Sequence, residues 1–152
     1  MADAVREDEQ AIRALVERYA DAVNRRDAGD WSALWAEDGV WEAFGRRIAG
    51  RDAVVAAWTA AMGAFDLVFH VAHGAVIDVL GDQARARWTV SERLRDTAGR
   101  PGLLLALYHD QYRREAGAWR FTHRRLQPIY QGPQDLSGPL PNPSPGEPPW
   151  ST

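Results

Sequence analysis

Cysteine is absent from the 152-residue chain, and lysine is absent too, so all 18 basic residues are arginine. The lack of cysteine excludes disulfides, iron–sulfur clusters, thiolate zinc sites and cysteine nucleophiles. The lack of lysine excludes Schiff-base catalysis, a pyridoxal phosphate anchor and a P-loop lysine. The functions that remain are acid–base chemistry on His, Asp, Glu, Tyr or Ser side chains, or binding alone.

The sequence also lacks long apolar runs and any large excess of one charge. No apolar stretch approaches the roughly 20 residues of a membrane span, and the acidic N-terminus does not resemble a secretory signal. The net charge is −3, and the arginines are scattered along the chain. We therefore expect a cytoplasmic protein that binds neither nucleic acid nor a membrane.

The length is that of one domain, which we place at residues 1–131. Residues 132–152 are rich in proline and are predicted to be an extended tail. This tail is either a floppy terminus or a strap over the cavity mouth or a dimer partner, with Leu140 and Trp150 as anchors.

The apolar spacing changes from helical to alternating along the chain. Helices are predicted over residues 8–27 and 31–35, the second capped by Asp30, and a third begins at a cap formed by Asp52. A short hairpin over residues 40–49 separates the last two helices. The period of two after Gly63 predicts strands over residues 67–72, 75–80, 83–94, 103–113 and 119–126. This order predicts an α+β fold in which three helices pack on one curved sheet.

Strand alternation places titratable side chains on the apolar side of this sheet. Glu92 shares a face with Trp88, Asp110 shares a face with Tyr108, and His70 lies between apolar neighbours. An unpaired buried charge costs several kcal/mol, so each acid must be paired, protonated or functional.

Tyr19 on the first helix is predicted to face the same space, which makes a catalytic group of His70, Tyr19, Asp110 and Glu92. Structural alternatives remain for three of them. His70 is also explained as a hydrogen-bonded core residue, Glu92 as the partner of an arginine, and Asp110 as part of a network with Arg125 or Tyr19.

Further side chains are expected to bind the substrate. Several tryptophans fill the core, and some of them line a pocket suited to a flat ring. His123 and Arg125 are predicted to face inward with Trp119, where Arg125 binds an acidic substrate or pairs with an acid. The predicted binding residues are Asn24, Trp41, Trp58, Trp88, Tyr108, His123 and Arg125. His70 and His73 fall on opposite faces of a strand, so we expect no metal, and no cofactor is expected.

Several segments resemble the SnoaL-like branch of the nuclear transport factor 2 superfamily. The resemblance covers about residues 8–130 and is carried by residues 12–24, 34–42, 50–53, 77–84 and 108–114, and by His70 and Trp119-Arg120-Phe121. It implies a cone-shaped fold whose three N-terminal helices pack on a strongly curved, mixed, mainly antiparallel sheet that encloses a cavity. It also implies a homodimer.

Particular enzymes of this superfamily match in part. In steroid Δ-isomerases, a tyrosine and a protonated aspartic acid form the oxyanion hole, and Tyr19 and Asp110 fall at similar places, but the base would align near Ala43. Tyr19 and His70 are similar in position to the catalytic pair of scytalone and bile-acid dehydratases. Those dehydratases carry an aspartate where this chain has Asn24. Glu92 stands about where the bile-acid enzymes have a second acid.

The resemblance and the residues together predict a cofactor-independent lyase or isomerase, dehydratase-like or cyclase-like, that acts on a small cyclic carbonyl compound. In this prediction His70 removes a proton beside the carbonyl, and Tyr19 and Asp110 donate hydrogen bonds to the enolate. Glu92 orients His70 or protonates the leaving hydroxyl. The alternatives are a non-catalytic binding protein that uses the same cavity, and an epoxide hydrolase whose water is activated between acids and Asn24.

Overall fold

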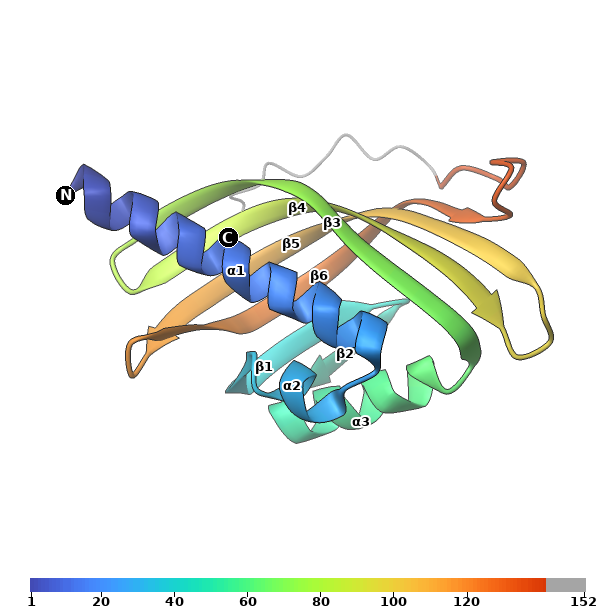
Figure 1. Ribbon diagram of the computed structural model, residues 1–152, viewed down its shortest axis with the longest axis horizontal. Helices are drawn as coiled ribbons and strands as arrows, with labels where there is room; N and C mark the ends of the chain where they lie inside the picture. The colour runs from blue at the N-terminus through green and yellow to red at the C-terminus, as the bar shows by residue number, and fades with distance from the viewer. Residues whose placement is uncertain (142–152) are drawn as a thin grey trace.

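The computed structural model describes residues 1–141 and shows an α+β fold of three helices and six strands over that range (Figure 1). This confirms the predicted fold class. The helices are α1 (Ala2–Arg25), α2 (Ala28–Ser32) and α3 (Arg51–Met62). The strands are β1 (Trp35–Ala43), β2 (Arg46–Ala49), β3 (Phe65–Leu80), β4 (Gln83–Asp96), β5 (Pro101–Glu115) and β6 (Ala118–Gly132).

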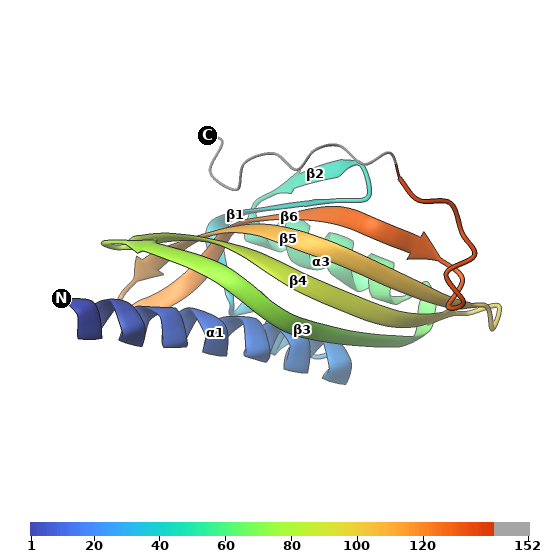
Figure 2. The same cartoon turned by 90° about the horizontal axis from the view of Figure 1, so that it is seen from above.

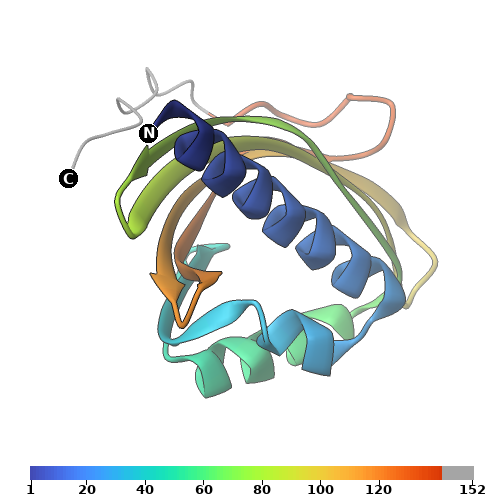
Figure 3. The ribbon, with the colours of Figure 1, turned by 60° about the vertical axis from the view of Figure 1, so that its left-hand side comes forward.

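All six strands form one mixed sheet in the order β2-β1-β6-β5-β4-β3. Strands β1 and β6 are parallel, whereas β3 to β6 form an antiparallel meander and β1 and β2 form an antiparallel hairpin. The helices lie on one face of the sheet (Figures 2 and 3). The sheet bends over these helices, but it lacks the strong curl that we expected.

The helix boundaries differ from the prediction at the caps. Asp27, and not Asp30, caps α2, because its side chain accepts a 2.9 Å hydrogen bond from the Asp30 backbone N–H. Trp35, expected at the end of this helix, instead opens β1. Gly50 precedes α3, while Asp52 lies in the first turn, where its charge favours the helix N-terminus.

Strand β3 is continuous where the sequence predicted two strands. The residues around Gly74, interpreted as a turn, form a β-bulge between Ala72 and Gly74. The extra residue shifts the alternation by one position. Val68 and His70 therefore face the helices before the bulge, and Ile77 faces them after it.

A second bulge corrects the predicted orientation of His123 and Arg125. Gln111 pairs with His123 and Tyr112 with Phe121, which leaves Thr122 as the extra residue of β6. Phe121 and Arg124 are consequently both fully buried at 0% exposure. The prediction that His123 and Arg125 face inward was wrong, because the bulge turns them to the other face of the sheet.

The face of the sheet opposite the helices carries exposed apolar side chains, including Phe69, Val76 and Ile129. A second copy of the chain was expected to cover such a face, and the homodimer stays a prediction. Within residues 1–141, none of the helices combines the length and the apolar character that crossing a membrane would require.

The chain leaves the sheet after Gly132, close to the predicted start of the tail. The Tyr130 hydroxyl donates a 2.6 Å hydrogen bond to the Pro133 carbonyl and accepts one of 3.0 Å from the Gly138 N–H. These bonds fix the first residues after β6. Leu140 is 74% exposed, so it does not anchor the tail on its own chain, and its anchoring on a dimer partner stays a prediction. The other predicted anchor, Trp150, lies outside the described residues.

Candidate active site

A pocket of about 270 Å³ lies between α1, α3 and the helix-facing side of the sheet. Most of its wall is apolar. The lining residues are Tyr19, Val23, Trp41, Phe44, Trp58, Ala61, Met62, Ala64, Phe65, Val68, Glu92, Leu94, Leu104, Tyr108, Leu126 and Gln131. Five of the residues predicted from the sequence belong to this wall, namely Tyr19, Trp41, Trp58, Glu92 and Tyr108.

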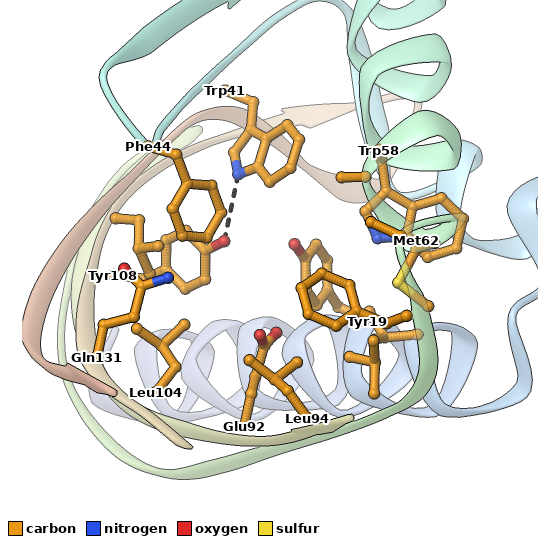
Figure 4. A pocket seen from close by; sticks show the side chains of 16 residues that line it. Tyr19, Trp41, Phe44, Trp58, Met62, Glu92, Leu94, Leu104, Tyr108 and Gln131 are labelled. Carbon is orange, nitrogen blue, oxygen red and sulfur yellow. Dashed lines mark hydrogen bonds between the residues drawn. The ribbon is translucent and has the colours of Figure 1, made fainter. Parts of the chain in front are cut away.

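The polar groups on the pocket wall include the hydroxyls of Tyr19 and Tyr108, the carboxyl group of Glu92 and the side-chain amide of Gln131 (Figure 4). The Trp41 indole N–H donates a 3.2 Å hydrogen bond to the Tyr108 hydroxyl, and the Tyr108 hydroxyl in turn interacts with that of Tyr19. Burial raises the pKa of Tyr19, and it raises the pKa of Tyr108 well above its usual value. Both hydroxyls therefore stay protonated near neutral pH and can donate hydrogen bonds.

Behind Glu92 lies His70, whose Nδ1 is 2.8 Å from the nearer Glu92 carboxylate oxygen. The His70 side chain is 1% exposed and that of Glu92 is 20% exposed, so the carboxyl group is the member of this pair that reaches the pocket. His70 Nε2 is buried, and no polar group of residues 1–141 bonds to it. A proton on Nδ1 lets the His70 ring donate this hydrogen bond to the Glu92 carboxylate.

Asn24 holds the main chain of His70 rather than its ring. The Asn24 side-chain oxygen accepts a 2.7 Å hydrogen bond from the His70 N–H, and its amide group donates one of 3.0 Å to the His70 carbonyl. The end of α1 and the middle of β3 are thereby joined at this residue. Asn24 fixes the position of His70 without contacting the pocket.

Asp110 takes part in a buried network outside the pocket wall. It accepts a 2.8 Å hydrogen bond from Arg124 Nε and one of 2.6 Å from the Tyr112 hydroxyl. Burial raises the pKa of Asp110, and Arg124 opposes that shift. Asp110 thus belongs to a buried network, but its partners are Arg124 and Tyr112 and not the predicted Arg125 or Tyr19. Asp110 does not line the pocket described above, where the sequence placed it beside the substrate.

The guanidinium of Arg124 lies against the rings of both pocket tyrosines. Its central carbon is 4.4 Å from the centre of the Tyr19 ring and 3.9 Å from that of Tyr108. The two terminal nitrogens have no hydrogen-bond partner among residues 1–141, so the aromatic faces and Asp110 surround this charge. Burial opposes the charged form of Arg124, but Asp110 and the tyrosines outweigh it and raise its pKa.

The remaining predicted residues lie elsewhere. Trp88 is a core residue whose indole N–H donates a 2.9 Å hydrogen bond to the Tyr112 hydroxyl. His123 is 2.8 Å from a carboxylate oxygen of Glu42 on the other face of the sheet. Arg125 also lies on that face. No group of three His, Asp or Glu side chains within residues 1–141 is arranged to hold a metal ion.

Sequence reasoning missed Arg124, although this residue underlies both pocket tyrosines. Strict alternation from Trp119 and Phe121 assigns the inward position to Arg125. The only signal in the sequence is the pair Arg124-Arg125, which does not show which of the two is buried.

Comparisons with known proteins agree with this architecture and confirm the family resemblance. The profile of the SnoaL-like domain matches residues 4–125. A function unknown protein from Mycobacterium tuberculosis is 29% identical, with a TM-score of 0.76 over 84% of this chain and 75% of that chain. No curated protein gives a match.

Two structures with lower identity share the fold. One, provisionally assigned as a scytalone dehydratase, comes from Novosphingobium aromaticivorans and is 24% identical, with a TM-score of 0.83 over 95% of this chain and 99% of that chain. The other is the hexachlorocyclohexane dehydrochlorinase LinA-type3 from Novosphingobium barchaimii, 20% identical, with a TM-score of 0.74 over 91% of this chain and 96% of that chain.

The buried pair predicts a large difference between two arginine substitutions. Arg124→Met leaves Asp110 without its buried partner and is expected to lower the free energy of unfolding by about 3–5 kcal/mol. Arg113→Met, which removes a half-exposed arginine paired with Asp38, is expected to lower it by less than about 1 kcal/mol. Urea unfolding measures both values. Equal losses in the two variants would contradict the role of the Arg124–Asp110 pair.

The raised pKa values of Tyr19 and Tyr108 predict how stability changes at alkaline pH. The unfolded tyrosines lose their protons near pH 10, whereas the folded ones keep them to higher pH. The free energy of unfolding is therefore unaffected by these groups below about pH 10 and falls as pH rises above it. In a Tyr19→Phe/Tyr108→Phe protein this fall is expected to be shallower, by up to about 1.4 kcal/mol per pH unit for each tyrosine. Urea unfolding between pH 8 and 11.5 tests this, and an unchanged slope would count against the pKa shifts.

Proposed function

Because this chain belongs to the SnoaL-like domain family, we propose that it is a cofactor-independent acid–base enzyme of the lyase or isomerase type. Its substrate in this proposal is a small cyclic carbonyl compound. The observation that carries the proposal is the His70–Glu92 pair, whose carboxyl group lines the same pocket as two tyrosine hydroxyls. A base and two hydrogen-bond donors on one apolar pocket are the groups that removal of a proton beside a carbonyl requires.

The names of the structural neighbours support an elimination. A dehydratase removes water and a dehydrochlorinase removes hydrogen chloride, and both reactions break a C–H bond and the bond to a leaving group. The apolar, aromatic wall with Trp41 and Trp58 suits a ring-bearing substrate. The substrate class of this chain is inferred from that wall and not from the neighbours.

The proton is transferred first to Glu92, since its carboxylate faces the pocket and His70 does not line it. The C–H electrons move to the carbonyl oxygen and form an enolate. His70 Nδ1 holds the carboxylate in place through its 2.8 Å hydrogen bond. This assignment exchanges the roles predicted from the sequence. There His70 removed the proton and Glu92 oriented His70.

The enolate oxygen accepts hydrogen bonds from the hydroxyls of Tyr19 and Tyr108. Tyr108 thus takes the place that the sequence assigned to Asp110. The positive charge of Arg124 below both rings stabilises the negative charge that they receive. When the enolate collapses, the C–C double bond forms and the leaving hydroxide takes the proton from Glu92, so water is released and Glu92 is again a carboxylate.

Substitutions of the pair test the proposal, with a matched control on the same strand. Glu92→Gln and His70→Ala are each expected to lower turnover at least about 10²-fold, because the proton acceptor or its partner is lost. His73→Ala removes an exposed histidine that bonds to Ser91 on the other side of β4, and turnover should be unchanged.

The readout is proton NMR in D2O with a panel of cyclic ketones, enones and β-hydroxy ketones. Deuterium that enters beside the carbonyl, or water that is lost, only with wild type and His73→Ala would support the proposal. Full turnover by Glu92→Gln would contradict it. Line broadening that shows binding without any exchange by wild type would instead favour a non-catalytic binding protein.

A further inference from the structure

The turn between β1 and β2 holds a bulky residue in a backbone conformation that suits glycine or asparagine. Ala43 pairs with Arg46, so Phe44 and Gly45 alone form the turn. Their φ angles are +54° and +75°, which is the type I′ geometry that favours Asn-Gly. A side chain as large as that of Phe44 is strained in this region of φ.

The protein itself covers the ring of Phe44 only in part. Phe44 is 55% exposed, and within residues 1–141 its ring belongs neither to the apolar core nor to any pair of stacked aromatic rings. Trp41, three residues earlier on β1, differs in both respects. It is 6% exposed and donates a hydrogen bond to Tyr108. The fold therefore accounts for a tryptophan at position 41 but not for a phenylalanine at position 44.

The ring of Phe44 lines the pocket, near Tyr108, Gln131 and Leu104 and across from Trp58 (Figure 4). This end of the pocket is apolar or uncharged. A ligand in the pocket would cover the exposed part of the ring and add apolar contact there.

We propose that Phe44 is a specificity-determining residue that closes over the flat, uncharged ring of the ligand. The strained turn is retained because of this contact, at the expense of stability. The inference rests on the proposed function only in taking this pocket as the ligand site. It predicts that a substitution that relieves the strain raises the stability of the protein. It also predicts that a substitution that removes the ring weakens binding of the ligand.

Two substitutions of Phe44 separate these effects, with the bicyclic ketone 1-tetralone as the binding probe. Phe44→Asn should raise the midpoint of thermal unfolding by about 2–4 °C, because asparagine accepts the turn, and should weaken binding of the ketone about tenfold. Phe44→Leu keeps the strain and removes the flat ring, so it should weaken binding without raising the midpoint. Isothermal titration calorimetry and scanning calorimetry give the two quantities.

The β5–β6 hairpin provides a matched control. Glu115 pairs with Ala118, and Ala116 and Gly117 form a turn with φ angles of +48° and +79°. This turn does not line the pocket described above. Ala116→Asn should raise the midpoint as Phe44→Asn does, and binding of the ketone should stay at the wild-type value.

The outcomes distinguish this inference from the proposed function. A Phe44→Asn protein that binds 1-tetralone as tightly as wild type, or that unfolds at a lower temperature, overturns the role of Phe44 and leaves the acid–base chemistry standing. Binding that depends on Phe44 in a protein that exchanges no protons with any ketone supports the inference and contradicts the proposed function. Failure of wild type to bind any ring compound of the panel overturns both.

Discussion

The charge of Arg124, enclosed between Asp110 and the rings of two pocket tyrosines, is the interaction on which the rest of the site depends. A guanidinium at 0% exposure is stable only with a carboxylate partner, and Asp110 supplies one at 2.8 Å. The tyrosine rings then pack on the charged group at about van der Waals distance. The orientation of both hydroxyls toward the pocket follows from this packing.

Some polar groups of the site line the pocket, and others lie behind its wall. The ion pair of Asp110 and Arg124 lies outside the pocket wall, whose polar groups include the neutral hydroxyls of Tyr19 and Tyr108, the Gln131 amide and the carboxyl group of Glu92. His70 is likewise placed behind the group that it contacts, with its main chain fixed by Asn24. A buried charge that acts through neutral donors stabilises a negative charge formed in the pocket without attracting anions in general.

The sequence predicted the fold class, the helix-facing side of most strands and five residues of the pocket wall, because helical and alternating periods follow directly from backbone geometry. It failed where a single extra residue interrupts a strand. The bulge at Thr122 exchanged Arg125 for Arg124 and thereby changed the role of Asp110. A bulge changes the side of every later residue, but residue type alone does not mark its position.

The remaining errors of the sequence-based prediction concern how far a side chain lies from the pocket, which strand or helix periodicity does not show. His70 and Glu92 were correctly expected on the same side of the sheet, yet alternation does not show that Glu92 reaches the pocket and His70 lies behind it. The strain at Phe44 was visible only once its φ was known. Pair geometry and backbone conformation thus assign the roles, whereas the sequence only supplies the candidates.

If this pocket stabilises an enolate, it also stabilises the anion of a bound phenol, so we would measure the ionisation of bound 2-naphthol. The measurement uses Glu92→Gln, in which the neutral amide stands in for the protonated acid of the enolate state. We expect bound naphthol to have a lower pKa than free naphthol, because Tyr19, Tyr108 and Arg124 favour its anion. A raised pKa of bound naphthol, as burial alone would produce, would show that the pocket does not stabilise an enolate.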